Sequence, residues 1–310
     1  MMTIEIKRTA GLALLMAAAL ALHGCARDAD AQTASASANA AEGRAYELKG
    51  TQVWSVADPV SGRDYEVFVS LPASYEAEPN RRYPVLYVTD ADYAFPIIRQ
   101  IARRVNLEGP VIEEFILIGL SYAKGDSGTD SRRRDYTPTP NGPRNSAGFV
   151  HGGGAAYQTY LKTQALPFVD QKFRTDPARR VLLGHSYGGL LGAQIMFTDP
   201  TMFSGYVLGS PSFWYDKRHM MTMEADYART HRDLPAKVFM YVGGLEGPGP
   251  TARHSRDADM VGDMRAMDRV LKSRTYPGLN LQSTVLADED HLTVAPVGFT
   301  RALMAVLPAK

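Results

Sequence analysis

A serine lies between two glycines in the pentapeptide GHSYG at residues 184–188. This G-x-S-x-G pattern is typical of a nucleophilic serine on a tight turn from a strand into a helix. The preceding residues 180–183 are suited to a strand, and an apolar helical pattern begins at Tyr187. Side chains in place of the two glycines would crowd such a turn. We therefore predict that Ser186 is a nucleophile that attacks a carbonyl carbon.

A nucleophilic serine needs a general base, and in hydrolases built around this turn the chain order is serine, acid, histidine. The chain contains seven histidines. Among them, His291 follows the last predicted strand, within the sequence DEDH at 288–291. We predict that His291 takes the proton of Ser186 and later gives one to the leaving group.

The acid of this triad should follow the strand predicted at 237–242, where Glu246 ends the sequence GGLE. Glu246 is the first choice. Asp257 and Asp259 lie in the same connection, and Asp290 directly precedes the histidine. These three carboxylates remain alternatives, as does a dyad without a strict acid.

The tetrahedral intermediate of acyl transfer needs two backbone N–H donors for its oxyanion. One donor is expected from Tyr187, directly after the nucleophile. The other should come from the loop after the strand at 84–89, where Ala91 and Asp92 are the candidates. The sequence HGGG at 151–154 resembles another oxyanion loop but lies one strand too late, so we interpret it as the entrance to a helix.

Two side chains are candidates for the substrate pocket. Arg134 ends a run of three arginines that is suited to attract an anionic substrate, although a solvated charged loop has the same composition. Trp214 follows a predicted strand at the edge that bears the nucleophile. It is suited to line an aromatic or acyl pocket, and equally to pack in the core.

Strands and helices alternate through residues 44–310, which predicts one α/β domain with a mostly parallel sheet covered on both faces. The predicted strands are 47–56, 65–71, 84–89, 115–120, 180–183, 206–208, 237–242 and 279–287. The predicted helices are 96–105, 155–173, 187–197, 260–271 and 297–307, with a break at Pro167. The carboxyl ends of these strands should carry the candidate residues.

The composition excludes several classes of protein. The chain has 310 residues, a formal net charge of +1 and one cysteine, Cys25. One cysteine cannot form an internal disulfide or supply a cluster of thiolate ligands. A nearly neutral chain lacks the basic surplus of a general nucleic-acid-binding protein. We expect a small-molecule ester as substrate, with no metal, no other cofactor and no nucleic acid.

The N-terminus has the features of an export signal. A basic pair precedes an apolar run at 10–22, which is too short to span a membrane comfortably. The run ends in LHGC at 22–25, which resembles the processing site of a bacterial lipoprotein. We predict a signal peptide at 1–24 and a lipid on Cys25, which would anchor the protein in the cell envelope, in the periplasm.

An alternative for the N-terminus is ordinary secretion with cleavage after Ala31, at an A-x-A site. Under the lipoprotein interpretation, residues 25–43 form a flexible tether, because they are small, polar and without apolar periodicity. Residues 44–310 are then the folded domain, and membrane contact is expected only through the lipid.

Several segments resemble the putative esterase family, which includes esterase D and the siderophore esterases that cleave enterobactin- and salmochelin-type trilactones. The matching segments are YPVLYV at 83–88 with Asp90, RDYTPT at 134–139, LPFVD at 166–170, GHSYGG at 184–189 and SPSFWYD at 210–216. The resemblance implies an α/β-hydrolase fold and a metal-free serine esterase with Ser186 and His291 as its catalytic pair. Ala91 stands where the family usually has glycine.

We therefore expect a serine hydrolase that cleaves a carboxylic ester through an acyl-enzyme. A siderophore trilactone, a short acyl ester and a xenobiotic ester all fit the motifs. The same triad would also suit an acyltransferase or a peptidase. A catalytically silent binding lipoprotein with a hydrolase fold is the alternative from another class, and the intact Ser186 and His291 argue against it.

Overall fold

The computed structural model describes residues 45–143 and 148–309. The chain divides after Lys49, and the unit that begins at Gly50 contains all the described strands and helices. The predicted signal peptide, Cys25 and the tether at 25–43 lie outside the described residues. Within the described residues, no helix is long and apolar enough to cross a membrane.

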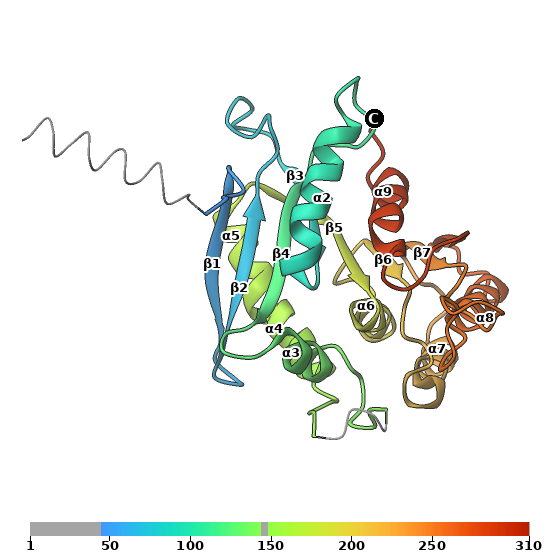
Figure 1. Ribbon diagram of the computed structural model, residues 1–310. Coiled ribbons are helices and arrows are strands. Elements are labelled where there is room, and N and C mark those ends of the chain that lie inside the picture. The colour runs from blue at the N-terminus through green and yellow to red at the C-terminus, as the bar shows by residue number, and fades with distance from the viewer. Residues whose placement is uncertain (1–44, 144–147, 310) are drawn as a thin grey trace, which may run out of the picture. The chain divides into compact units, whose positions relative to one another are not determined.

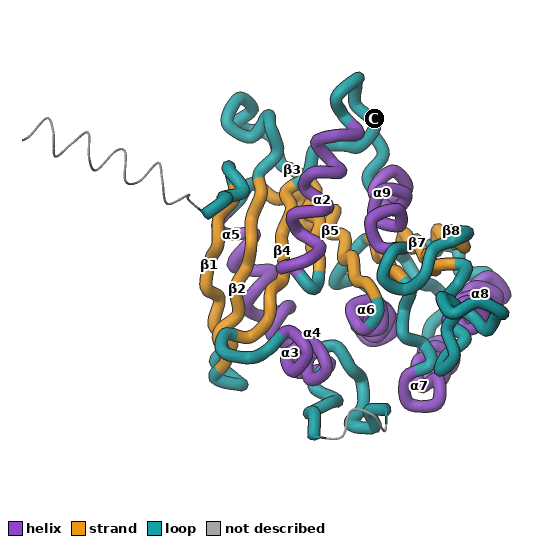
Figure 2. The backbone as a smooth tube through the Cα atoms, viewed as in Figure 1, coloured by secondary structure: helices purple, strands orange, loops and turns teal. Residues whose placement is uncertain are grey.

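Eight strands form one sheet in the order β1-β2-β4-β3-β5-β6-β7-β8 (Figure 1, Figure 2). Their bounds are β1 Thr51–Asp58, β2 Arg63–Ser70, β3 Tyr83–Val88, β4 Ile116–Ala123, β5 Thr175–His185, β6 Gly205–Gly209, β7 Lys237–Gly243 and β8 Asn280–Leu286. β2 is antiparallel to both β1 and β4, and every other neighbouring pair is parallel. The predicted α/β-hydrolase class, with a mostly parallel sheet, is confirmed.

Helices pack on the sheet from both sides. α2 packs on β4, α9 packs on β6 and β7, and these two helices contact each other. α6 packs on β5 and β6 and contacts α3, α4 and α7, while α8 packs on β7 and β8. The bounds are α2 Ala91–Val105, α3 Gly128–Asp135, α4 Gly154–Tyr160, α5 Leu166–Lys172, α6 Tyr187–Thr198, α7 Tyr215–Thr230, α8 Met260–Ser273 and α9 Val294–Val306.

The continuous apolar runs of the sequence form the centre of the sheet. All six residues of β3 and all five of β6 are buried, as expected for parallel strands covered on both faces. α6 is also buried on every side from Tyr187 to Phe197. β5 is buried at residues 181–184, so the turn at Ser186 joins two segments that are both buried in the core.

The structure differs from the predicted elements at several places, among them β1, which begins at Thr51 rather than at residue 47, and β5, which begins at Thr175 rather than at residue 180. α2 begins at Ala91 rather than at residue 96, because Asp90 has left-handed backbone angles and Pro96 is accommodated inside the helix. α3 and α7 were not predicted, since both are largely polar and lack an apolar stripe. The predicted break at Pro167 is confirmed: a π-helical turn precedes α5, and Pro167 lies in its first turn.

Candidate active site

Ser186 occupies a strained turn between β5 and α6, with φ 61° and ψ −119°. A Cβ on Gly184 would overlap the carbonyl group of Gly188, and a Cβ on Gly188 would overlap the hydroxyl of Thr89. Both positions therefore require glycine. The turn holds the serine at the carboxyl end of β5, where α/β sheets bind their ligands.

The structure brings Ser186, His291 and Glu246 together in one chain of contacts. Nε2 of His291 lies 3.1 Å from Oγ of Ser186. Nδ1 of the same ring lies 2.6 Å from Oε2 of Glu246. These are the contacts of a nucleophile, a base and an acid that orients the base. The three residues follow β5, β8 and β7, so strands from the same half of the sheet supply them.

Burial and hydrogen bonds fix the position of Glu246 next to the histidine. Its side chain is buried, and Oε1 accepts hydrogen bonds from the Ser210 hydroxyl at 2.5 Å and the Gly243 N–H at 2.8 Å. Burial alone would raise the pKa of Glu246, but the hydrogen bond and charge of His291, with those two donors, lower the pKa below its usual value. The carboxylate therefore stays ionised and is suited to stabilise an imidazolium.

The alternative acids have other surroundings. Asp290 pairs with Arg253, whose Nε lies 2.8 Å from Oδ2, and this pairing lowers the pKa of Asp290. Asp259 caps α8 by accepting a hydrogen bond from the N–H of Gly262 at 2.8 Å. Asp257 is exposed. The geometry therefore favours Glu246 as the acid.

Glu246→Gln tests the choice of acid. An amide cannot carry the charge that stabilises the imidazolium and can select the wrong histidine tautomer, so we expect kcat to fall by about 10²–10⁴-fold. Asp290→Asn is the comparison, because it removes a neighbouring charge and keeps the side-chain size. Steady-state hydrolysis of a p-nitrophenyl ester measures both variants. A larger loss in Asp290→Asn than in Glu246→Gln would move the acid to Asp290.

The predicted oxyanion donors lie at the starts of α6 and α2. The first N–H groups of a helix have no acceptor within their own helix, which applies to Tyr187, Ala91 and Asp92. The N–H of Thr89 donates to the carbonyl of Leu183, so the turn after β3 lies beside the nucleophile turn. The two helix starts thus present free N–H groups at one edge of the sheet.

The methyl group of Ala91 packs at a place that β4 leaves open. A Cβ on Gly119 would lie 2.9 Å from Cβ of Ala91. Because position 119 is glycine, the alanine fits without moving the turn. The start of α2 therefore accommodates the methyl group of Ala91 against Gly119 of β4.

A polar cluster fixes the turn that carries Ala91. The Asp90 carboxylate accepts hydrogen bonds from the hydroxyl of Tyr122 at 2.7 Å and from Nε of Arg132 at 3.0 Å. The guanidinium of Arg132 also lies 5.2 Å from the centre of the Tyr187 ring. Arg132 therefore links the turns at the starts of α2 and α6.

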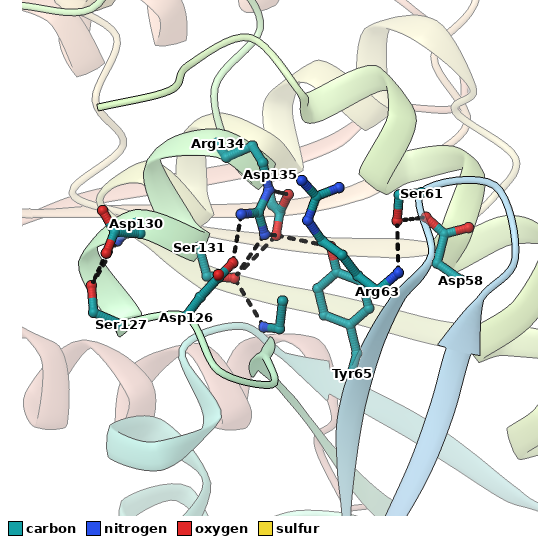
Figure 3. Close-up of polar contacts among 11 residues, drawn as sticks. Asp58, Ser61, Arg63, Tyr65, Asp126, Ser127, Asp130, Ser131, Arg134 and Asp135 are labelled. Carbon is teal, nitrogen blue, oxygen red and sulfur yellow. Dashed lines mark hydrogen bonds and ion pairs between the residues drawn. The ribbon is translucent and has the colours of Figure 1, made fainter. Parts of the chain in front are cut away.

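Arg134 requires a correction, because the structure does not place it among the residues that line the cavity at Ser186. Its guanidinium pairs with Asp126 at 2.5 Å and Asp135 at 2.8 Å, and Tyr65 donates to the same Asp135 carboxylate (Figure 3). Two carboxylates nearby in sequence thus hold Arg134 on α3, where Asp135 also accepts a hydrogen bond from Tyr65 of β2. Arg132 is the member of the arginine run that contacts the nucleophile turn.

The glycine-rich segment at 152–154 forms part of the scaffold, in agreement with its interpretation as a helix entrance. The N–H of Gly152 donates to Oγ1 of Thr137, and the N–H of Gly154 donates to the carbonyl of the same threonine. The N–H of Gly153 donates to the carbonyl of Arg134. These amides are therefore committed to hydrogen bonds inside the fold.

A cavity of about 420 Å³ opens at Ser186 and His291. Trp214 lies in its lining together with the apolar Leu245 and Met260, and so does the ion pair of Arg253 with Asp290. A larger cavity of about 890 Å³ lies at the amino end of β4 and is not lined by the triad. Across residues 45–143 and 148–309, no group of three or more His, Cys, Asp or Glu side chains is suited to hold a metal ion.

Three polar residues at the site were missed from the sequence. Ser210 holds Glu246, and Ser212 has its hydroxyl 3.4 Å from that of Ser186. Both belong to the segment SPS that directly follows β6, and that position at the sheet edge was the available signal. His185 contacts the backbone of His291, with Nε2 3.1 Å from the carbonyl oxygen.

His185 makes the stability of the fold depend on pH. Burial and then the charge of His291 lower the pKa of His185 to about 3, although the charge of Glu246 and the hydrogen bond to the His291 carbonyl oppose part of this shift. The unfolded chain takes up this proton below about pH 6.5, while the folded chain does so only near the lowered pKa. The free energy of unfolding therefore falls as the pH falls through this window.

Urea unfolding at neutral pH and at about pH 5 measures this effect. Between these two pH values, we expect the free energy of unfolding to fall by about 1–2 kcal/mol more in the wild type than in His185→Gln, whose side chain does not titrate. Equal losses in the two proteins would show that His185 keeps its ordinary pKa in the folded state.

Comparisons with known proteins agree with this geometry. The Esterase family, described as putative esterase, matches residues 59–280. The ferri-bacillibactin esterase BesA of Bacillus subtilis is 26% identical over 281 residues, which are 87% of this chain and 93% of that protein. The siderophore triacetylfusarinine C esterase of Aspergillus fumigatus is 30% identical over 263 residues, 78% of this chain and 88% of that protein.

A solved structure shows the same fold. The BES protein from Bacillus cereus superposes with a TM-score of 0.73 and 22% identity, over 86% of this chain and 98% of that one. The siderophore hydrolase EstB from Aspergillus nidulans superposes with a TM-score of 0.69, also at 22% identity, over 86% and 98%.

Proposed function

Because the chain belongs to the putative esterase family, we propose that it hydrolyses a carboxylic ester through an acyl-enzyme on Ser186. The observation that carries this proposal is the continuous contact from Ser186 through His291 to the buried Glu246. That arrangement supplies a nucleophile, a base and a counter-charge for the base.

In the acylation step, the Ser186 oxygen attacks the ester carbonyl while Nε2 of His291 takes its proton. Glu246 holds the resulting imidazolium, and the N–H groups of Tyr187 and Ala91 stabilise the oxyanion. The tetrahedral intermediate then collapses: the bond to the alcohol oxygen breaks, and His291 gives the proton to that oxygen. An acyl ester of Ser186 remains.

In the deacylation step, His291 takes a proton from water, and the resulting hydroxide oxygen attacks the acyl carbon. The same N–H groups stabilise the second oxyanion. Collapse releases the carboxylic acid, and the proton returns from His291 to the oxygen of Ser186. The reaction consumes one water and needs no redox partner.

We propose a siderophore-type ester as the substrate. The support is that two relatives are named as esterases of siderophores. The chain matches each of them over most of its length. The cavity also combines the apolar side chains of Leu245 and Met260 with the ring of Trp214, which suits a ligand with aromatic or acyl parts.

A substrate panel tests this choice. The panel contains bacillibactin and triacetylfusarinine C, each with and without iron, p-nitrophenyl butyrate, and a p-nitroanilide as an amide. We expect the highest kcat/KM for a siderophore ester and no cleavage of the amide. A higher kcat/KM for the simple ester would reject the siderophore assignment, and acyl transfer to an added alcohol in preference to water would indicate a transferase.

We also propose that the protein is a lipoprotein of the bacterial envelope, attached through Cys25. The support is the apolar run followed by LHGC at 22–25. In a bacterial host, Cys25→Ser should abolish incorporation of labelled palmitate and move the protein from the membrane fraction to the periplasmic extract. Full retention of the variant with membranes would contradict the lipid anchor.

A further inference from the structure

The ring of His185 lies between two aromatic neighbours at the end of β5. Its centre is 4.8 Å from that of the His291 ring and 6.2 Å from that of Tyr241, which it stacks on at 21°. The contact with His291 also includes the backbone, because Nε2 of His185 lies 3.1 Å from the His291 carbonyl oxygen. A carbonyl only accepts, so Nε2 carries the proton.

The other ring nitrogen completes a single hydrogen-bonding pattern. With the proton on Nε2, Nδ1 of a neutral imidazole is an acceptor, and the hydroxyl of Tyr241 lies 3.4 Å from it. One neutral tautomer thus satisfies both contacts. A protonated ring would turn Nδ1 into a donor, for which Tyr241 must then reverse its hydroxyl.

Two glycines leave the space that the ring of Tyr241 occupies. A Cβ on Gly209, in β6, would overlap the phenol end of the tyrosine ring, and a Cβ on Gly298, in α9, would overlap its edge. The buried ring therefore lies close to the backbone of both β6 and α9, at positions where a side chain would exclude it. Tyr241 is thus a core residue against which His185 packs.

The loop of His291 needs such support, since β8 ends at Leu286 and α9 begins at Val294. The carbonyl of Glu289 accepts a hydrogen bond from the N–H of Leu245 at 3.0 Å, and Asp290 pairs with Arg253. These bonds hold the residues before the histidine. The bond from His185 is made to the peptide of His291 itself.

We infer that His185 is a positioning residue, which fixes the backbone of His291 through the bond from Nε2 to its carbonyl and so sets the distance from the imidazole to Ser186. The inference rests on the proposed function, because it concerns the base of that reaction. His185 acts only through His291 and touches neither the substrate nor the reacting oxygen.

The electrostatics of the site suit this role. His291 gains a positive charge during the reaction, and a second cation at the distance of His185 would oppose it. The groups that face His185 are His291, Glu246, Arg132 and Tyr241, and burial with the His291 charge lowers the pKa of His185. His185 therefore stays neutral while His291 cycles.

Two replacements of similar length separate the hydrogen bond from the packing. In His185→Gln, the amide nitrogen can occupy the place of Nε2 and donate to the same carbonyl. His185→Met has a similar length and volume without a donor. His185→Phe is a further variant, which keeps a ring against His291 and Tyr241 and also lacks the donor.

With p-nitrophenyl butyrate as substrate, we expect His185→Gln to retain kcat within about threefold of the wild type, since it keeps the bond. We expect His185→Met and His185→Phe to lose about 10–100-fold in kcat with little change in KM, because a displaced base affects the chemical step. Urea unfolding of each variant, measured alongside the kinetics, shows whether the variant is folded. If His185→Met does not fold, His185→Phe is compared with His185→Gln in its place.

Equal kcat values for His185→Gln and the variants that lack the donor would overturn the inference while leaving the esterase active. A loss that appears in KM alone would also overturn it. A wild-type protein that cleaves no ester would overturn the proposed function and, with it, this role of His185.

Discussion

Ser186→Ala is expected to lower kcat for ester hydrolysis by about 10⁴–10⁶-fold, the range found when a serine nucleophile of this type is removed. Without the hydroxyl no acyl-enzyme can form, and only the oxyanion donors and substrate binding remain. KM should change little, because alanine is smaller than serine and does not obstruct the cavity. Steady-state kinetics with p-nitrophenyl butyrate measure the loss.

The control for this substitution is Ser204→Ala. Ser204 is exposed just before β6, at the amino edge of the sheet and away from the triad. The same change of serine to alanine should leave kcat unaltered there. A loss of less than about tenfold in Ser186→Ala would mean that another group is the nucleophile. Ser212, whose hydroxyl lies 3.4 Å away, would then be the first to test.

His291→Ala is expected to have the second large effect, a fall in kcat of about 10⁴–10⁶-fold. The alanine variant keeps the nucleophile, but nothing remains at 3.1 Å from its oxygen to take the proton. It also leaves the buried Glu246 without its main partner, so unfolding by urea must be measured alongside activity. Activity that rises with hydroxide concentration would fit the loss of a general base.

His231→Ala is the matched control for the histidine. His231 is exposed at the end of α7 and stacks on Tyr227, with ring centres 4.0 Å apart. It should lose little activity. Near-normal turnover by His291→Ala in a folded protein would reject His291 as the base.

The sequence predicted the elements whose apolar runs are long and buried on all sides. β3 and β7 agree with their predicted bounds to within one residue, because a strand covered on both faces must be apolar throughout. α3 and α7 were missed for the opposite reason. Their sequences are mostly polar, and α7 even contains left-handed residues at 216–218, so no helical periodicity marks them.

The candidate site could be predicted as far as chain order determines it. Ser186, Glu246 and His291 each follow a parallel strand, so their side of the sheet could be inferred from the order of elements. The order of elements does not show which carboxylate contacts the histidine, because Glu246 and Asp290 both lie in loops at that edge of the sheet. The choice depends on the turn after β7, where the Gly243 N–H and Ser210 bind the glutamate.

Contacts across long stretches of the chain account for what the sequence did not reveal. The Ser210–Glu246 bond joins residues 36 apart, and the bond from His185 to His291 joins residues 106 apart. Arg134 was placed in the pocket from its charge alone. In the structure its guanidinium forms ion pairs with Asp135 and Asp126. Composition alone does not show which carboxylates an arginine pairs with.

The central claim, that Ser186 is an activated nucleophile, is tested most directly by covalent labelling with a fluorophosphonate followed by peptide mass spectrometry. One adduct per chain is expected, located on Ser186. Ser186→Ala should carry no adduct, and His291→Ala should be labelled much more slowly. A wild-type protein that does not react, or a Ser186→Ala variant that is labelled equally well, would contradict an activated nucleophile at Ser186.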